Sequence, residues 1–479
     1  MTSGRTWIKR ADWVIGWDAA GERHVYLTGA DVVFTGATID FVGRDYDGQA
    51  ETVIDGAGLM VMPGLIDIHS HPSDEPKSKG LFEEVGSRLL HNTTLIEYMP
   101  LVRGDQSAAE AAGAVALSEL LQSGCTTLAD LSMTRPGWLD LLAESGIRAY
   151  AAPMFRAARW YTPNGHEVLY EWAEDGGRSS LAEALATVDA AEAHACGRLK
   201  GMLAPAQIDT CTPELLKNSA AAARERGLPW QIHASQSVVE FREIVRRHGR
   251  TPVEWLDGLD LLGPGAIIAH AIFLDHHPWL HWPDHDDLRR LGESGANIAH
   301  CPNIFARRGM LLTDFARYRK AGVTIGIGTD SFPHNMIDEM RWATVLAKVS
   351  TGDVHSISVA DVFAAATIGG ARALGRDDIG RLAPGCRADI VLIDATHPAM
   401  RPLRDPLRSL VFSALERPVR EVYVDGRRVV ADGAVATLDY AAAAERLEVA
   451  QKRALAGVAE RDWAGRDADE MFPLSLPMA

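Results

Sequence analysis

The sequence predicts an α/β protein: a (β/α)8 TIM-type barrel carrying a small β-sandwich that is formed from both chain termini. Residues 63–378 alternate short apolar strands with helices, and the alternation occurs eight times, which is typical of a parallel barrel. Residues 1–62 and 379–438 are instead rich in β-branched and aromatic residues with glycine-rich breaks, as in a small antiparallel domain. Residues 439–479 are predicted to be a C-terminal helix and tail.

The composition limits the class of protein. The chain has 479 residues, 47% of them hydrophobic and 23% charged, which is enough to bury a large core. Its net charge of -16 argues against nucleic acid or an anionic membrane as a partner. No window approaches the ~18 apolar residues of a membrane span, and the N-terminus lacks a signal peptide's apolar core. The five cysteines are scattered, as in a cytoplasmic protein with reduced thiols.

The two β-rich ends contain short predicted strands. On the N-terminal side these are residues 13–17, 24–27, 30–34 and 37–42. On the C-terminal side we expect a strand at 387–393 and a hairpin at 419–430, turning at Asp425-Gly426. Since both ends are β-rich and the middle is not, the simplest arrangement is one sandwich shared by both termini.

The barrel strands begin with the apolar stretch from Val61 to His71, interrupted only by Pro63 and Gly64. The other seven are predicted at 125–130, 147–152, 199–204, 230–233, 266–270, 296–300 and 323–330. Helix signals separate them. Thr212 is a helix cap with Pro213 in the first helical position, and that helix ends at Gly227.

Histidines and an aspartate stand at the ends of several predicted strands. His69 and His71 are two residues apart, so on a strand they point to the same side. His233 and Asp330 end the strands at 230–233 and 323–330. The carboxyl ends of barrel strands share one face. We therefore predict a divalent metal held by His69, His71, His233 and Asp330, with His270 close enough to bond a bound water.

These residues carry a family resemblance. The chain resembles the amidohydrolase superfamily, in the cytosine-deaminase-like and triazine (chlorohydrolase/aminohydrolase) branch. The resemblance covers nearly the whole chain and rests on these stretches: Met62-Pro-Gly-Leu-Ile-Asp-Ile-His-Ser-His71, His233, Ala269-His270, His300-Cys-Pro302, Gly328-Thr-Asp330, Asp338-Glu-Met-Arg341 and Leu382-Ala-Pro-Gly-Cys-Arg-Ala-Asp-Ile-Val391.

The resemblance implies a hydrolase that uses a metal-activated water on a non-peptide carbon–nitrogen bond. The expected substrate is a small amidine-, urea- or triazine-like compound that loses amine or ammonia. Asp330 would accept the water's proton, and His270 would orient the nucleophile and stabilise developing charge. One metal is expected, because no lysine ends the fourth strand; it is Zn²⁺, with Fe²⁺, Mn²⁺ and Co²⁺ as alternatives. Relatives commonly form homo-oligomers, so a dimer or larger assembly is expected.

Two positions depart from the family pattern. Deaminases of this branch carry a glutamate three residues after the strand-five histidine, where this chain has Gln236. Glutamine can hydrogen-bond a substrate but cannot transfer a proton as a carboxylic acid does. Glu240, one helical turn further on, is an alternative acid. The histidine that often follows the fourth strand is also missing, because Pro205 is followed by Ala206 and Gln207.

Two further interpretations are open, and Gln236 favours the first of them. Hydrolytic release of halide or thiolate needs no protonated glutamate and would use the same metal site. A non-catalytic scaffold is the third interpretation, but it predicts missing metal ligands, and every predicted ligand is present.

Several loop residues are candidates for substrate contact. They are Gln236 itself, His334 and Asn335 after Asp330, Asn303 after His300-Cys-Pro302, and Trp160. Trp160-Tyr161 and the segment 82–98 are expected to form an apolar pocket wall. The loop at 275–285 is rich in histidine and tryptophan. It is a candidate lid or subunit contact, and a second metal site there is the less favoured alternative.

Overall fold

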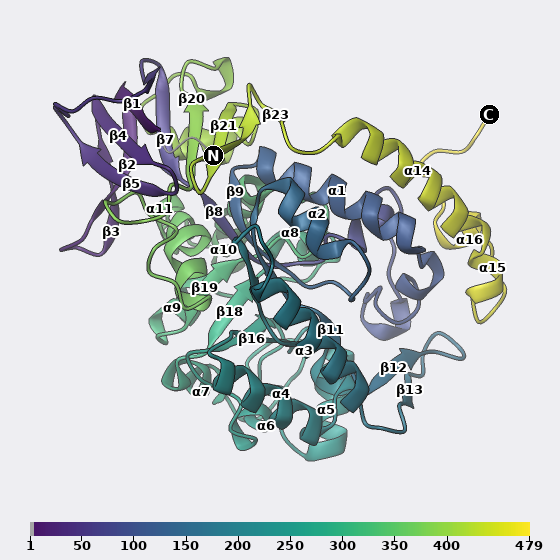
Figure 1. Ribbon diagram of the computed structural model, residues 1–479. Coiled ribbons are helices and arrows are strands. Elements are labelled where there is room, and N and C mark those ends of the chain that lie inside the picture. The colour runs from purple at the N-terminus through teal and green to yellow at the C-terminus, as the bar shows by residue number, and fades with distance from the viewer. Residues whose placement is uncertain (1–3) are drawn as a thin grey trace.

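The computed structural model describes residues 4–479 and contains a β-rich part beside an α/β part (Figure 1). In the figure, purple N-terminal strands lie next to green C-terminal strands at one end of the molecule. The helices are α1 (Gln106–Gln122), α2 (Trp138–Ser145), α3 (Arg178–Glu192), α4 (Pro213–Arg226), α5 (Val238–His248), α6 (Pro252–Gly258), α7 (Asp287–Ser294), α8 (Pro302–Ala306), α9 (Phe315–Lys320), α10 (Met336–Thr351), α11 (Val359–Ala364), α12 (Gly370–Ala373), α13 (Pro406–Ser409), α14 (Tyr440–Ala456), α15 (Val458–Arg461) and α16 (Ala468–Met471). None of the helices in the described part of the chain has the length and apolar character needed to cross a membrane.

Both chain ends contribute to one seven-stranded sheet, in the order β23-β22-β21-β20-β7-β2-β3. Its strands are β2 (Trp13–Asp18), β3 (Arg23–Leu27), β7 (Leu59–Pro63), β20 (Ile390–Asp394), β21 (Val419–Val424), β22 (Arg427–Ala431) and β23 (Ala434–Val435). The termini meet where β7 pairs antiparallel with β20, with Val61 opposite Leu392. Strands that are more than 300 residues apart in the sequence therefore share one ladder.

A second sheet, ordered β5-β4-β1-β6, packs against the first. It consists of β1 (Arg5–Ala11), β4 (Ala30–Thr35), β5 (Thr38–Gly43) and β6 (Thr52–Asp55). Ile8, Val32 and Phe34 from this sheet bury against Val61 and Leu392 of the seven-stranded sheet. The inner faces of two sheets thus enclose an apolar core, as in a sandwich. The strand predictions missed β1, whose apolar residues are interrupted by Arg5, Thr6, Lys9 and Arg10, and β6, which has only four residues.

The middle of the chain forms two four-stranded parallel sheets, β14-β10-β9-β8 and β16-β17-β18-β19. Their strands are β8 (Leu65–Ser70), β9 (Cys125–Asp130), β10 (Arg148–Ala151), β14 (Leu199–Gly201), β16 (Trp230–Ala234), β17 (Ala266–His270), β18 (Asn297–His300) and β19 (Thr324–Ile327). Isolated parallel bridges join the sheets at both edges, between Ser70 and Asp330 and between Leu203 and Trp230. All eight segments coincide with predicted strands.

Alternation along these strands divides their side chains between two cores. Ile66 and Ile68 of β8 face an inner cluster with Ile267 and Ala269 of β17. Leu65 belongs to a larger cluster between the strands and the surrounding helices. Burial on both faces explains why the strands are apolar throughout rather than alternating with polar residues.

The stretch from Val61 to His71 contributes to both parts of the fold. It ends β7 at Pro63, turns at Gly64 and starts β8 at Leu65. The Gly64 N–H donates to the Asp389 carbonyl at 3.0 Å. A Cβ at Gly64 would lie 2.0 Å from Thr126 Oγ1, so only glycine allows this close approach. The two histidines are thereby attached to the β-rich part through a very short connection.

Smaller elements surround the mouth of the α/β part. β11 (Met154–Phe155) pairs with β15 (Ala204–Pro205), and β12 (Ala158–Tyr161) forms a hairpin with β13 (Leu169–Trp172). The helix α14 lies along α1 (Figure 1), with Leu447 packed against Val115. Beyond it, Phe472 packs on Phe82. The end of the chain therefore covers the loop that follows β8.

Candidate metal centre and its cavity

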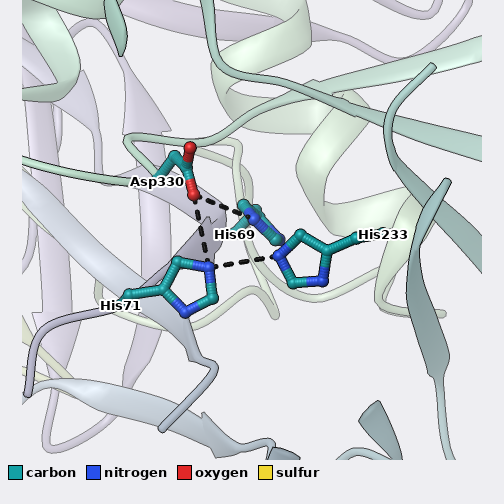
Figure 2. A group of neighbouring side chains, drawn as sticks. All are labelled: His69, His71, His233 and Asp330. Carbon is teal, nitrogen blue, oxygen red and sulfur yellow. Dashed lines mark hydrogen bonds and ion pairs between the residues drawn. The ribbon is translucent and has the colours of Figure 1, made fainter. Parts of the chain in front are cut away.

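The four predicted metal ligands converge on one point (Figure 2). His69 lies in β8 and His71 just after it, His233 lies in β16, and Asp330 follows β19. The Nε2 atoms of His69 and His71 lie 3.2 and 3.3 Å from Asp330 Oδ1, and the Nε2 atoms of His71 and His233 are 3.2 Å apart. Tetrahedral bonds of about 2.0–2.1 Å would separate two ligand atoms by about 3.3–3.4 Å. The gap has the size of a zinc site.

The outer ring nitrogens show which nitrogen of each histidine faces the gap. His71 Nδ1 lies 2.7 Å from the Leu131 carbonyl. His233 Nδ1 contacts the Ala206 carbonyl, and His69 Nδ1 contacts Gln231 Oε1. Carbonyl oxygens only accept hydrogen bonds, so each Nδ1 carries a proton and each Nε2 faces the gap. Once the Nε2 atoms are free of protons, their lone pairs point at one another, and a cation between them turns that repulsion into coordination.

Burial and mutual charge set the protonation of this group. Burial raises the pKa of Asp330, but hydrogen bonds from His69 and His71 outweigh it and bring that pKa well below the usual value. Burial lowers the pKa of His233 well below its ordinary value, and the neighbouring histidines lower it further. Burial also lowers the pKa of His71, yet the hydrogen bond that His71 donates to Asp330, together with the charge of Asp330, overcomes this and raises the pKa to about 9. A metal ion must therefore displace a proton from His71 at neutral pH.

His270 ends β17 beside the four ligands. It is fully buried, its ring centroid is 4.8 Å from that of His69, and neither ring nitrogen has a hydrogen-bond partner among residues 4–479. His270 and Asp330 have φ angles of 78° and 59°. Left-handed backbone at non-glycine residues is costly and gathers at functional sites. An unpartnered imidazole here can bond a water molecule on the metal.

A cavity of about 400 Å³ opens from the four ligands, and His71, His233 and Asp330 form part of its wall. Two predicted substrate-contact residues, Gln236 and Trp160, also line it. Trp160 Nε1 donates to Asp209 Oδ2 at 2.7 Å, which fixes the indole. The loop after β8 contributes Leu95, Met99 and Pro100. Phe82 does not take part, because it packs on Phe472.

The other three residues predicted to contact substrate bond to, or pack against, other parts of the protein instead. Asn335 caps α10 by accepting the Ile337 and Asp338 N–H groups, and its amide donates to Glu416 at 2.7 Å. Asn303 Nδ2 donates to Asp338 Oδ2 at 3.1 Å. His334 is fully buried beside Glu119. None of the three lines the cavity, so the geometry gives no support to substrate contacts from them.

The structure also gives no support to Glu240 as a replacement acid or to a second metal site in the loop at 275–285. Glu240 accepts the backbone N–H groups of Ser235 and Gln236 at 2.7 and 2.9 Å, so it holds the loop after β16 and does not line the cavity. In the loop at 275–285, Asp275 accepts the N–H groups of Asp286 and Asp287. Within residues 4–479, the groups that could hold a metal do not include this loop.

Several charged residues of the cavity carried no signal in the sequence. Glu75, four residues after His71, lines it and accepts a bond from Ser331 Oγ at 2.7 Å. The cavity is also lined by further acidic and basic residues, namely Asp74, Lys77, Arg103, Arg156, Arg159 and Arg308. The arginines come from separate loops, so no spacing relates them.

Comparison with known proteins agrees with this geometry. The family model described as "Amidohydrolase family" matches residues 60–429. A 5'-deoxyadenosine deaminase of Methanothermobacter thermautotrophicus is 31% identical over 400 residues, covering 82% of this chain and 87% of the relative. A 5-methylthioadenosine/S-adenosylhomocysteine deaminase of Natronomonas pharaonis is 29% identical, covering 88% of this chain and 92% of the relative.

Two solved structures share the fold at low sequence identity. One is an adenosine deaminase from Xanthomonas campestris with bound zinc, at a TM-score of 0.78 and 22% identity, covering 94% of this chain and 98% of the other. The other is an atrazine chlorohydrolase from Arthrobacter aurescens complexed with zinc, at a TM-score of 0.78 and 22% identity, covering 93% and 100%. With four ligand atoms arranged for a divalent metal and a family model spanning most of its length, this chain belongs to the amidohydrolase family and is a metal-dependent hydrolase of carbon–nitrogen bonds.

Proposed function

We propose that this enzyme hydrolyses a non-peptide carbon–nitrogen bond of a small amidine-, urea- or triazine-like compound and releases amine or ammonia. The observation that carries the proposal is the group of three inward-facing Nε2 atoms and one carboxylate at the wall of a 400 Å³ cavity. The deaminase relatives support amine or ammonia release. The cavity is large enough for a small heterocycle.

The proposed roles follow from the contacts of each side chain. His69, His71, His233 and Asp330 hold the metal, which when bound lowers the pKa of a coordinated water from ~16 towards ~7. Asp330 accepts the proton of the attacking water and returns it to the leaving nitrogen. His270, whose nitrogens are unpartnered among the described residues, orients the water and stabilises the negative charge that develops on the heteroatom bonded to the attacked carbon.

Gln236 supports a second candidate, hydrolytic release of halide or thiolate. It lines the cavity where deaminases of the branch carry a glutamate, and an anionic leaving group needs no proton from that position. Its amide can still bond a ring nitrogen or an exocyclic group of the substrate. A non-catalytic scaffold has no support, since all four ligand side chains are in place.

We also infer the architecture that presents this site. Residues 63–378 act as one closed (β/α)8 barrel, because the bridges at Ser70–Asp330 and Leu203–Trp230 join the two parallel sheets. Residues 1–62 and 379–438 act as one sandwich domain, and 439–479 as a C-terminal helix and tail. A homo-oligomer and a cytoplasmic location stay predictions of the sequence.

One screen separates the candidates. The zinc-loaded protein is offered heterocycles, ureas and thiocarbamates, and ammonia, amine, halide and thiol are each measured. Gln236→Glu is compared with the unchanged enzyme, and Gln122→Glu on α1 is the surface control. Strong acceleration of amine release by Gln236→Glu supports the first candidate, and no change supports the second. Both candidate functions require the metal. Less than a tenth of an equivalent of metal bound to the protein after gentle purification would therefore refute both.

A further inference from the structure

One wall of the cavity carries three arginines, Arg103, Arg156 and Arg159, which we call the arginine wall. Arg103 follows the short helical turn Met99–Val102, Arg156 follows β11, and Arg159 lies in β12. They share the cavity with His71, His233 and Asp330. The wall is therefore positively charged in a chain whose net charge is -16.

Among the described residues, no carboxylate makes a direct ion pair with Arg103 or Arg156, and the one that pairs with Arg159 is exposed. Arg159 pairs with Glu171 at 3.0 Å, but both side chains are more than half exposed, so the pair is weak. Within residues 4–479, no ion pair or side-chain hydrogen bond involves the guanidinium of Arg103 or Arg156. Burial lowers the pKa of the half-buried Arg156, the charges of Arg159 and Arg103 lower it further, and the charge of Asp74 offsets only part of this lowering. The guanidinium groups thus repel one another across a shared space.

The acidic residues of the same cavity are engaged elsewhere. Asp74 pairs with Lys77, Glu75 accepts from Ser331 Oγ at 2.7 Å, and Asp330 contacts the histidines at 3.2 and 3.3 Å. A half-buried guanidinium without a partner carries an unfavourable desolvation cost. Guanidinium donors match carboxylate and phosphate oxygens in geometry and charge. An anionic ligand would satisfy the wall without disturbing the metal ligands.

We propose that the substrate carries an oxyanion group, a carboxylate or a phosphate, which the arginine wall binds while the scissile carbon–nitrogen bond lies at the metal centre. The reaction in this proposal rests on the proposed function, whereas the anion site rests on the arginines alone. It narrows the substrate class, because neutral triazines and neutral nucleosides lack the group. Trp160, between Arg159 and the hairpin turn, packs beside the same space.

Binding of small anions tests the wall separately from catalysis. Calorimetry on the zinc-loaded full chain uses succinate, inorganic phosphate and the neutral analogue succinamide. The double variant Arg156→Gln/Arg159→Gln is expected to weaken succinate or phosphate binding by about tenfold or more, because charge-assisted hydrogen bonds are lost. Whichever of the two anions shows the loss identifies the group. Arg226→Gln on α4, an exposed arginine paired with Asp189, should leave the affinity unchanged.

Three results would overturn the proposal: no binding of either anion, equal affinity in the double variant, or succinamide binding as tightly as succinate. An anion held by the metal alone would survive in the double variant and so counts against the wall. The double variant should melt at the same temperature or higher, since like charges are removed. Arg103→Gln, at an exposed position, is the second variant if the double variant misfolds.

Substrate pairs separate this proposal from the proposed function. Each compound hydrolysed in the screen is compared as its free acid and as its methyl ester, and the arginine wall predicts a lower kcat/KM for the ester. Zinc-dependent turnover of neutral compounds alone would refute the wall and leave the hydrolase function intact. Anion binding lost in the double variant, with no compound hydrolysed, would refute the function and leave the wall.

Discussion

Gln231 holds the first metal ligand in place, and its removal should weaken metal binding. The side chain is fully buried in β16. Its Oε1 accepts from His69 Nδ1, and its Nε2 donates to the Ile68 carbonyl at 2.9 Å. It therefore sets both the tautomer and the ring orientation of His69. Gln231→Met keeps the volume but removes both bonds.

The expected loss follows from what such partners contribute. Outer hydrogen-bond partners of metal ligands are worth about 10–100-fold in metal affinity, which is about 1.4–2.7 kcal/mol. Metal binds only the folded state, so at saturating zinc the metal-induced gain in unfolding free energy should shrink by the same amount. The direct measurement is the zinc dissociation constant by competition with a chelator. Urea unfolding with and without zinc gives an independent value.

A matched control distinguishes the loss of His69 orientation from the general effect of replacing a glutamine by methionine. Gln122→Met on α1 removes a 3.3 Å bond to the Gly433 carbonyl, far from the ligands in the fold, and should leave zinc affinity unchanged. A zinc dissociation constant for Gln231→Met within twofold of the unchanged protein would refute the reasoning. His69 would then be oriented by its strand alone.

Three further outcomes are expected. Arg148→Met should lower the unfolding free energy in urea by about 3–5 kcal/mol, because Arg148 bonds Asp389 and Asp425 at 3.1 and 2.6 Å and Asp389 would stay buried without a cation; a loss below about 1 kcal/mol contradicts this. Burial lowers the pKa of His300 from 6.5 to about 3. Between these pH values the imidazole of His300 is protonated in the unfolded chain but not in the folded protein, so the free energy of unfolding falls as the pH drops. His300→Asn should reduce this slope by about 1.4 kcal/mol per pH unit, measured by unfolding from pH 6.5 downwards; an unchanged slope would exclude His300 as its source. Removal of metal with a chelator should abolish hydrolysis, and added zinc should restore it in the unchanged enzyme but not in His233→Ala.

The sequence alone identified the four residues that gather at the candidate metal centre, because each stands at a position with a local geometric rule. His69 and His71 are two apart on a strand, and His233 and Asp330 end strands that a parallel fold gathers on one face. Turn and cap signals were equally local. The hairpin turns at Asp425-Gly426, and Thr212 caps α4 by accepting the Leu215 N–H. Such features depend on neighbours within a few residues, so the sequence contains them.

The sequence did not determine which loop side chains face the cavity. Asn335 and Asn303 follow strands as a substrate-binding residue would, yet one caps α10 and the other bonds Asp338. Glu75 and Arg156 line the cavity although nothing in their spacing marks them. An amide or a guanidinium side chain can cap a helix, join an ion pair or bind a ligand with the same chemistry. The choice depends on atoms brought close by distant parts of the chain.

The tertiary structure also determined how the two histidines of the stretch from Val61 to His71 are oriented. Sequence periodicity placed His69 and His71 on one strand, but only the packing shows that Gln231 and the Leu131 carbonyl turn both Nε2 atoms towards Asp330. The same packing sets Arg156 beside Arg103 and Arg159. The sequence thus determined the chemistry of the metal centre, because ligand type and strand register are local properties. The shape and charge of the cavity arise from contacts between loops that no local pattern connects.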